Sequence, residues 1–193
     1  CANLFGLLAT EGGSSVIMTS SHLNYLTLGS MLDREGYEGW AFHNNTYTYY
    51  GRDLSYPNMG YEYYGLGNGL EVTRSWPESD LEMMEQSVDD YIHEPQFHAY
   101  YMTFSGHYQY NPNDNGIVRE HYNSLEDSPW SQVTQKGYIA CHIELDKALE
   151  YLLQRLEEAG VADKTAIVIA PDHHPYGMQD KDYIFNFIAS HER

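Results

Sequence analysis

Basic side chains are scarce in this chain of 193 residues, which has 10 Lys and Arg against 28 Asp and Glu. The formal net charge is −18 at pH 7. A field of this sign repels a phosphate backbone, so the composition argues against nucleic acid as a partner. An anionic substrate would need a metal ion or a local basic pocket to be held against it.

Long apolar runs and cysteine motifs are missing as well. No run approaches the roughly 20 residues that a membrane helix requires, and no signal peptide is visible. The two cysteines, Cys1 and Cys141, make neither a disulfide framework nor a CxxC metal motif. Because residue 1 is not Met, we expect a processed chain or part of a longer protein, with targeting information outside it.

Apolar and aromatic residues are plentiful. The hydrophobic fraction is 42%, which predicts a globular domain with a sizeable core. The 19 tyrosines add rings that pack yet keep a hydroxyl, so Tyr-rich loops suit polar, hydroxylated ligands. Packing at the edge of the core is the alternative use for most of them.

The hydrophobic patterns alternate between helical and extended periods. The predicted elements, in order, are helix 22–37, strand 38–45, helix 79–95, strand 97–104, helix 131–160 and strand 165–170. Ser79 caps the second helix, and Glu82 completes a capping box. This order predicts an α/β fold with a mostly parallel sheet flanked by helices.

Apolar residues at helical spacing mark the faces that we expect to be buried. In the first helix they are Leu23, Leu26, Met31 and Leu32. In the long helix they are Ile139, Ile143, Ala148, Leu149, Leu152, Leu153 and Leu156, with His142 beside them at the core or its edge. We read His121 as a surface or packing residue.

Polar side chains follow all three predicted strands. They occupy residues 43–45, 105–107 and 172–174. Ligands of parallel sheets bind at the carboxyl ends of the strands, so these positions predict one shared site.

Asp172 and His173 are the candidate metal ligands. A carboxylate and an imidazole in one loop can turn toward one cation, and mixed O and N ligation suits Mn²⁺ or Zn²⁺ better than Ca²⁺. His174 is a weaker candidate. The alternative is a plain turn between Pro171 and Pro175, with Asp172 capping the loop and the histidines exposed.

His107 and Arg52 are the candidates for holding an anion. His107 follows the small residues 105–106, which would let a ligand approach the backbone. The Arg52 guanidinium offers a fork that matches phosphate or sulfate. The alternatives are an ordinary loop histidine and an ion pair between Arg52 and Asp53.

Three segments together resemble one family. "FHNNTYTYYGRDLSYPNMGYEYY", "MTFSGHYQY" and "YIACHIELDKALEYLLQRLEEAGVADKTAIVIAPDHH" have the order and spacing of the lipoteichoic acid synthase branch of the sulfatase-like group. That group belongs to the alkaline phosphatase superfamily. The resemblance covers roughly residues 12 to 178.

The resemblance implies roles for the candidate residues. Asp172 and His173 match two ligands of one divalent metal, Mn²⁺ in the synthases, with Zn²⁺, Mg²⁺ or Ca²⁺ as alternatives. His107 matches a histidine that contacts the substrate phosphate, and His43 and Arg52 match residues lining a glycerol-phosphate pocket. Two further pocket positions depart from the synthases, which have Asp and Trp where this chain has Asn45 and Tyr50. The preference for a head group therefore stays open.

The resemblance also implies that residues 1–193 are a partial catalytic domain. The threonine nucleophile and a glutamate ligand of the family would lie before Cys1, and the closing segment after the last residue. Ser14, Ser15 and Thr19 lie beyond the nucleophile motif and are not assigned to it.

The expected activity is transfer of glycerol phosphate from a phosphatidylglycerol-like lipid, at the extracellular face of the bacterial membrane, by a membrane-anchored parent protein. The alternatives are a hydrolytic sulfatase or phosphodiesterase, or a non-catalytic domain that binds metal or anions.

Overall fold

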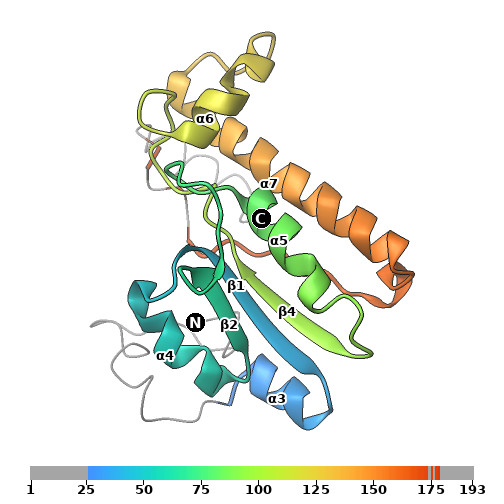
Figure 1. The fold of residues 1–193 in the computed structure, drawn as a ribbon. Helices are drawn as coiled ribbons and strands as arrows, with labels where there is room; N and C mark the ends of the chain where they lie inside the picture. The colour runs from blue at the N-terminus through green and yellow to red at the C-terminus, as the bar shows by residue number, and fades with distance from the viewer. Residues whose placement is uncertain (1–25, 174, 176, 179–193) are drawn as a thin grey trace, which may run out of the picture.

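The computed structural model describes residues 26–173, 175, 177 and 178. Its centre is a four-stranded sheet with the order β3-β2-β1-β4, in which every neighbouring pair is parallel (Figure 1). The strands are β1 (Glu38–Thr46), β2 (Glu62–Leu66), β3 (Gly69–Leu70) and β4 (Phe97–Met102). The predicted α/β class is confirmed.

Helices lie on both sides of this sheet (Figure 1). The α-helices are α3 (Leu28–Arg34), α4 (Arg52–Ser55), α5 (Asp80–Ser87), α6 (Gly116–His121) and α7 (Val133–Glu158). Single 3-10 turns are η1 (Tyr49–Gly51), η2 (Pro57–Met59), η3 (Val88–Asp90), η4 (Tyr122–Leu125) and η5 (Ala162–Lys164). No helix in the described part of the chain is long and apolar enough to cross a lipid bilayer.

The alternation of β1 divides the core into two layers. Phe42 belongs to the larger cluster, with Met83 of α5 and Leu152 of α7. Its neighbour Ala41 points the other way, into a tyrosine-rich cluster beside α4 and η2 that includes Tyr56. Because side chains of a strand alternate between faces, consecutive residues at the end of β1 also face different partners.

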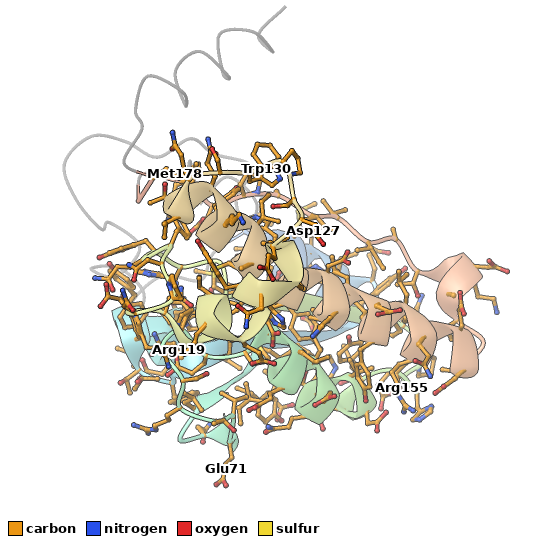
Figure 2. The ribbon with its side chains drawn as sticks, turned by 90° about the horizontal axis from the view of Figure 1, so that it is seen from above. Glu71, Arg119, Asp127, Trp130, Arg155 and Met178 are labelled. Carbon is orange, nitrogen blue, oxygen red and sulfur yellow. The ribbon has the colours of Figure 1, made fainter. Side chains whose placement is uncertain are left out.

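The long helix α7 forms where its apolar period predicted it. Ala148, Leu152 and Leu156 are buried against α5 and the sheet. Leu153 is 47% exposed and His142 is also exposed, so their predicted place at the buried stripe is wrong. Figure 2 shows Trp130 and Arg155 near opposite ends of this helix.

Helix α5 begins as the sequence predicted. The Ser79 hydroxyl accepts from the Glu82 amide and so caps the helix. The Glu82 carboxylate does not return the contact but accepts from the amide of Thr73, 2.5 Å away. The α-helix ends at Ser87 and continues as η3, well before the predicted end at residue 95.

The first helix is shorter than predicted. Thr27 caps it, and Gly36 follows its end with a φ of +86°, a conformation open to glycine. Leu26, which lies before the helix begins, and Met31 are more than half exposed, so their predicted burial is wrong. Leu23 lies outside the described residues.

The predicted strand 165–170 is wrong. These residues form no strand, and Val168 is 89% exposed. A run of this composition becomes a strand only when it pairs, and none of the described strands is paired with it, although β4 ends the sheet. The sheet gains β2 and β3 instead, which the sequence reading missed.

The start of α7 makes a close contact that can be tested. A Cβ added at Gly137 would lie 2.3 Å from the carbonyl oxygen of Tyr110. We expect Gly137→Ala to lower the free energy of unfolding in urea by about 1–3 kcal/mol, because overpacking outweighs the better helix propensity of Ala. Lys147→Ala, on the exposed side of the same helix, is the control and should change it by less than about 0.5 kcal/mol. A stabilised Gly137→Ala protein would contradict this contact.

Candidate functional site

The end of β1 carries His43, which is only 2% exposed. Its Nδ1 lies 2.7 Å from the carbonyl oxygen of Met102, and since a carbonyl only accepts, Nδ1 donates the proton. Nε2 then holds a lone pair and has no partner among the described residues. Burial, with a smaller effect of the Arg52 cation, lowers the pKa of His43 to about 4. His43 is therefore a neutral imidazole that can accept a hydrogen bond.

Arg52 begins α4 and is held by tyrosines. Its Nε donates to the Tyr56 hydroxyl at 3.2 Å, and Nη1 donates to the Tyr49 carbonyl at 3.3 Å. The rings of Tyr49 and Tyr50 lie 5.5 and 5.6 Å from the guanidinium carbon. Among the described residues, none of the ion pairs formed involves Arg52, so the alternative of a pair with Asp53 is not realised.

The backbone of Tyr50 is strained. Its φ of +55° is in the left-handed region, which costs a residue with a side chain about 1–2 kcal/mol. Such conformations persist where the surroundings enforce them, and they cluster at functional sites. This left-handed conformation turns the chain from β1 into α4 and places the Tyr50 ring beside Arg52.

His107 follows β4 in an aromatic loop. Its Nδ1 donates to the Tyr108 carbonyl at 3.0 Å, and its ring lies 4.8 Å from Phe104 and 5.4 Å from Trp76 between centroids. The Phe104 ring also meets the ring of His43 edge-on at 5.8 Å. Phe104 therefore contacts both histidines.

Asp172 and His173 lie together in the turn after residues 165–170. The His173 amide donates to Oδ1 of Asp172 at 2.9 Å, and the imidazole Nε2 lies 3.3 Å from Oδ2. Both side chains are about half exposed. They can offer one oxygen and one nitrogen to a cation, and a full shell needs further ligands. His174 lies outside the described residues.

One hollow of about 1580 Å³ collects most of the predicted site. Six of the seven predicted residues line it: His43, Tyr50, Arg52, His107, Asp172 and His173. Asn45 is not among the lining residues, and its side-chain oxygen accepts from the amide of Thr46. The candidate metal ligands and the candidate anion-binding groups therefore line the same large hollow, and their meeting in one site stays a prediction.

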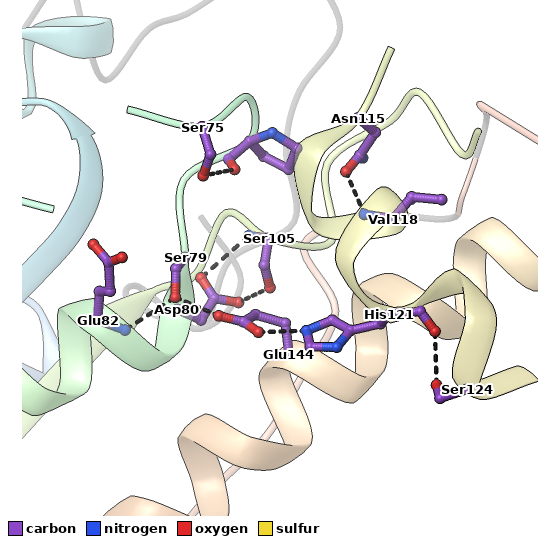
Figure 3. A network of polar contacts seen from close by, with 11 residues as sticks. Ser75, Ser79, Asp80, Glu82, Ser105, Asn115, Val118, His121, Ser124 and Glu144 are labelled. Carbon is purple, nitrogen blue, oxygen red and sulfur yellow. Dashed lines mark hydrogen bonds and ion pairs between the residues drawn. The ribbon is translucent and has the colours of Figure 1, made fainter. Parts of the chain in front are cut away.

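A buried carboxylate that the sequence reading passed over ties the strand ends together. Asp80 is fully buried, and its Oδ1 accepts from Asn44 Nδ2 at 2.8 Å and from the amides of Phe104 and Ser105 at 2.7 and 3.2 Å. The Ser105 hydroxyl donates to Oδ2 (Figure 3). Burial raises the pKa of Asp80, and these hydrogen bonds oppose the rise.

A second buried carboxylate joins three helices. Glu144 of α7 accepts from the Ser79 hydroxyl and from Nε2 of His121, the latter at 2.7 Å (Figure 3). The reading of His121 without a specific partner is therefore corrected. Glu120, His121 and Glu144 form a group whose ligand atoms lie within 4.8 Å of one another, so this group is a second place where a cation could bind.

The buried hydroxyl and thiol groups nearby are not arranged as nucleophiles. Ser79 and Ser105 are buried, each donates to a buried carboxylate, and neither is among the described residues that line the hollow, so their hydroxyls do not face a substrate there. Cys141 is buried, which raises the pKa of its thiol to about 12. The thiol of Cys141 therefore stays protonated and unreactive near neutral pH.

The fold is similar to parts of two solved structures. The crystal structure of the lipoteichoic acid synthase LtaP from Listeria monocytogenes matches 91% of this chain and 45% of its own, with a TM-score of 0.66 and 17% identity. A protein in the alkaline phosphatase superfamily from Vibrio parahaemolyticus matches 90% of this chain and 44% of its own, with a TM-score of 0.60 and 14% identity. At such identities the likeness establishes the fold.

The chain belongs to the sulfatase family, whose model matches residues 3–190. Lipoteichoic acid synthase-like YvgJ of Bacillus subtilis is 24% identical over 92% of this chain and 29% of its own length. Lipoteichoic acid synthase 1 of the same organism is 28% identical over 89% of this chain and 26% of its own. The resemblance to the lipoteichoic acid synthase branch is confirmed, and the chain spans about a quarter of the length of these relatives.

The buried His43 makes stability depend on pH in a defined direction. Its pKa is about 4 in the folded protein, against about 6.5 when unfolded, so between these values only the unfolded chain takes up the proton. We expect stability on the order of 3 kcal/mol to be present above pH 6.5 and lost as the pH falls to about 4. The difference in urea unfolding free energy between wild type and His43→Gln, measured from pH 7.5 to 4, isolates this contribution.

His142→Gln is the matched control, because His142 is exposed on α7. It should keep the pH dependence of the wild type. Parallel pH curves for wild type and His43→Gln would show that His43 is not buried as a neutral ring.

Proposed function

We propose that the protein containing this chain is a metal-dependent phosphoglycerol transferase of the lipoteichoic acid synthase type, anchored in the membrane and acting at the extracellular face of a bacterial cell. One observation carries the proposal. Arg52 has no carboxylate partner among the described residues of a chain with a net charge of −18, and it lines the same hollow as His43 and His107. A cation kept out of ion pairs on so acidic a protein suits a phosphate ester.

The proposed pocket contacts the two parts of the head group differently, with a cation for the phosphate and a hydrogen-bond acceptor for the glycerol. Arg52 would pair with the phosphate, and its position is fixed by Tyr49 and Tyr56 before the ligand arrives. His43 offers an acceptor at Nε2 and so suits a hydroxyl of glycerol. His107 would lie near the phosphate, on the other side of Phe104.

A divalent cation fits the proposal through Asp172 and His173. Their oxygen and nitrogen atoms face the same side of one turn, and this donor set suits Mn²⁺ or Zn²⁺. Mg²⁺ and Ca²⁺ are alternatives. When bound, such an ion lowers the pKa of a hydroxyl and offsets charge on phosphoryl oxygens. We assign the nucleophile to a threonine outside these residues, in accord with the place of that group in the family.

A hydrolytic sulfatase or phosphodiesterase is the closest alternative, because the same scaffold serves both chemistries. The neutral His43 favours a glycerol phosphate group over a bare sulfate, since sulfate carries no hydroxyl for Nε2 to accept from. This argument does not separate the transferase from a phosphodiesterase that acts on the same group. A chain that only binds metal or anions is the other alternative, and turnover by the full-length protein on phosphatidylglycerol or on aryl sulfates decides among the three.

Binding of the head group tests the pocket directly. We expect glycerol 3-phosphate to bind this chain and Arg52→Ala to weaken it by about tenfold or more, because a charge-assisted hydrogen bond is lost. The measurement is the dissociation constant from shifts of the histidine ring signals by NMR, repeated with sulfate.

Arg119→Ala is the control, because the described hydrogen bonds of Arg119 go to backbone carbonyls of residues 112 and 113 and Arg119 does not line the hollow. Its affinity should equal that of the wild type. Equal losses of affinity for glycerol 3-phosphate in the two arginine variants would show that the net charge, and not the position of Arg52, is responsible. Tighter binding of sulfate than of glycerol 3-phosphate would favour the hydrolase.

Metal binding tests the second half of the site. Titration of free Mn²⁺ followed by electron paramagnetic resonance should show binding that falls by at least about tenfold in Asp172→Ala and in His173→Ala. Glu120→Ala is the control for the other group of ligands and should leave the affinity unchanged. Loss of Mn²⁺ in Glu120→Ala alone would place the cation at Glu144 and His121 and remove it from the hollow.

A further inference from the structure

Asp80 lies in the wall of the hollow, with its side chain fully buried. Its four hydrogen bonds come from two separate strand ends: Asn44 belongs to β1, while Phe104 and Ser105 follow β4. In Figure 3 the Asp80 carboxylate, at the start of α5, points at Ser105. One side chain therefore connects α5 with the ends of both central strands.

The donors and the carboxylate depend on one another. A fully buried carboxylate is costly unless it is hydrogen-bonded, and buried amides left without an acceptor are costly as well. Bonds to an ionised acceptor are about twice as strong as neutral ones. The positions of Asn44, Phe104 and Ser105 are therefore fixed together and not one by one.

Each of these donors is one or a few residues from a group that lines the hollow. Asn44 is the neighbour of His43, and the alternation of β1 sends the two side chains to opposite faces. Phe104 contacts the rings of both His43 and His107, and Ser105 precedes His107 by two residues. A shift of the Asp80 carboxylate would thus move both histidines.

We infer that Asp80 is a positioning residue, which holds the carboxyl ends of β1 and β4 at the separation that lets His43 and His107 contact one ligand. The inference rests on the proposed function for the identity of that ligand, a glycerol phosphate group. Asp80 acts through Asn44, Phe104 and Ser105, because its side chain is fully buried and each of its described hydrogen bonds comes from one of these residues.

Glu144 supplies the contrast with a purely structural role. It is buried to a similar degree, and its two oxygens bind Ser79 and His121, so it joins α5, α6 and α7. It does not contact the strand ends. If Asp80 mattered only for stability, loss of either carboxylate would have the same consequences for the site.

The experiment compares Asp80→Ala, Asp80→Asn and Glu144→Ala in the full chain with glycerol 3-phosphate as the probe. We expect Asp80→Ala to weaken binding by about tenfold to a hundredfold, because displaced groups bind far less well. Asp80→Asn keeps an acceptor oxygen and should rescue binding to within about threefold of wild type, and Glu144→Ala should also stay within about threefold. Both alanine variants should lower the midpoint of thermal unfolding.

A second readout needs no ligand. The His43 pKa, near 4 in the wild type, should rise toward its ordinary value in Asp80→Ala and stay unchanged in Glu144→Ala. If wild type does not bind glycerol 3-phosphate, the proposed function fails, and the titration of His43 alone decides whether Asp80 positions the strand ends.

The inference is overturned if Asp80→Ala and Glu144→Ala affect binding and the His43 pKa equally, or if Asp80→Ala leaves both unchanged. Should Asp80→Ala fail to fold, Ser105→Ala replaces it, since that variant removes only the hydroxyl donor. A weaker affinity for glycerol 3-phosphate and a raised His43 pKa in Ser105→Ala, each changed less than expected for Asp80→Ala, support the positioning role. Wild-type values of both quantities reject it.

Discussion

The hydrogen bonds to Asp80 are the constraint on which the candidate site depends. β1 and β4 are adjacent parallel strands, so their ladder fixes their register but not the path of the loops that follow. The Asp80 carboxylate extends that control past the last ladder bond, to Asn44 on one strand and to residues 104–105 after the other. The bond from His43 to the Met102 carbonyl adds a second tie on the opposite face. Together these hydrogen bonds link the ends of β1 and β4 beyond the last ladder bond between the two strands.

The different roles of the neighbouring residues His43 and Asn44 follow from strand geometry. His43 and Asn44 are consecutive, yet one faces the hollow and the other faces α5, because side chains of a strand alternate. A site built at the end of a central strand therefore has its supporting contacts on the reverse face of the same strand.

The sequence predicted those parts of the structure that local patterns determine. β1, β4 and α7 are confirmed, because strong periodicity and apolar content act within each segment. β2 was missed, since Gly65 and four tyrosines between residues 56 and 64 hide its alternation. The site was found through polar residues after strands, but Asp80 and the pair of Glu144 with His121 were not, because their partners lie 23 or more positions away. The error at 165–170 has the same cause: composition favours a strand, and pairing decides whether one forms.

The uncharged stretch Ile167–Ile169 has a consequence for the chain in solution. Its aliphatic side chains are open to water, and β4 is the last strand on its side of the described sheet. Two surfaces of this kind are adhesive, while a net charge of −18 keeps copies apart. Salt weakens only the second effect, since the screening length shrinks to about 8 Å at physiological ionic strength. We therefore expect copies of the chain to associate more readily as the ionic strength rises, because salt screens the charge repulsion and leaves the β-sheet contacts unaffected.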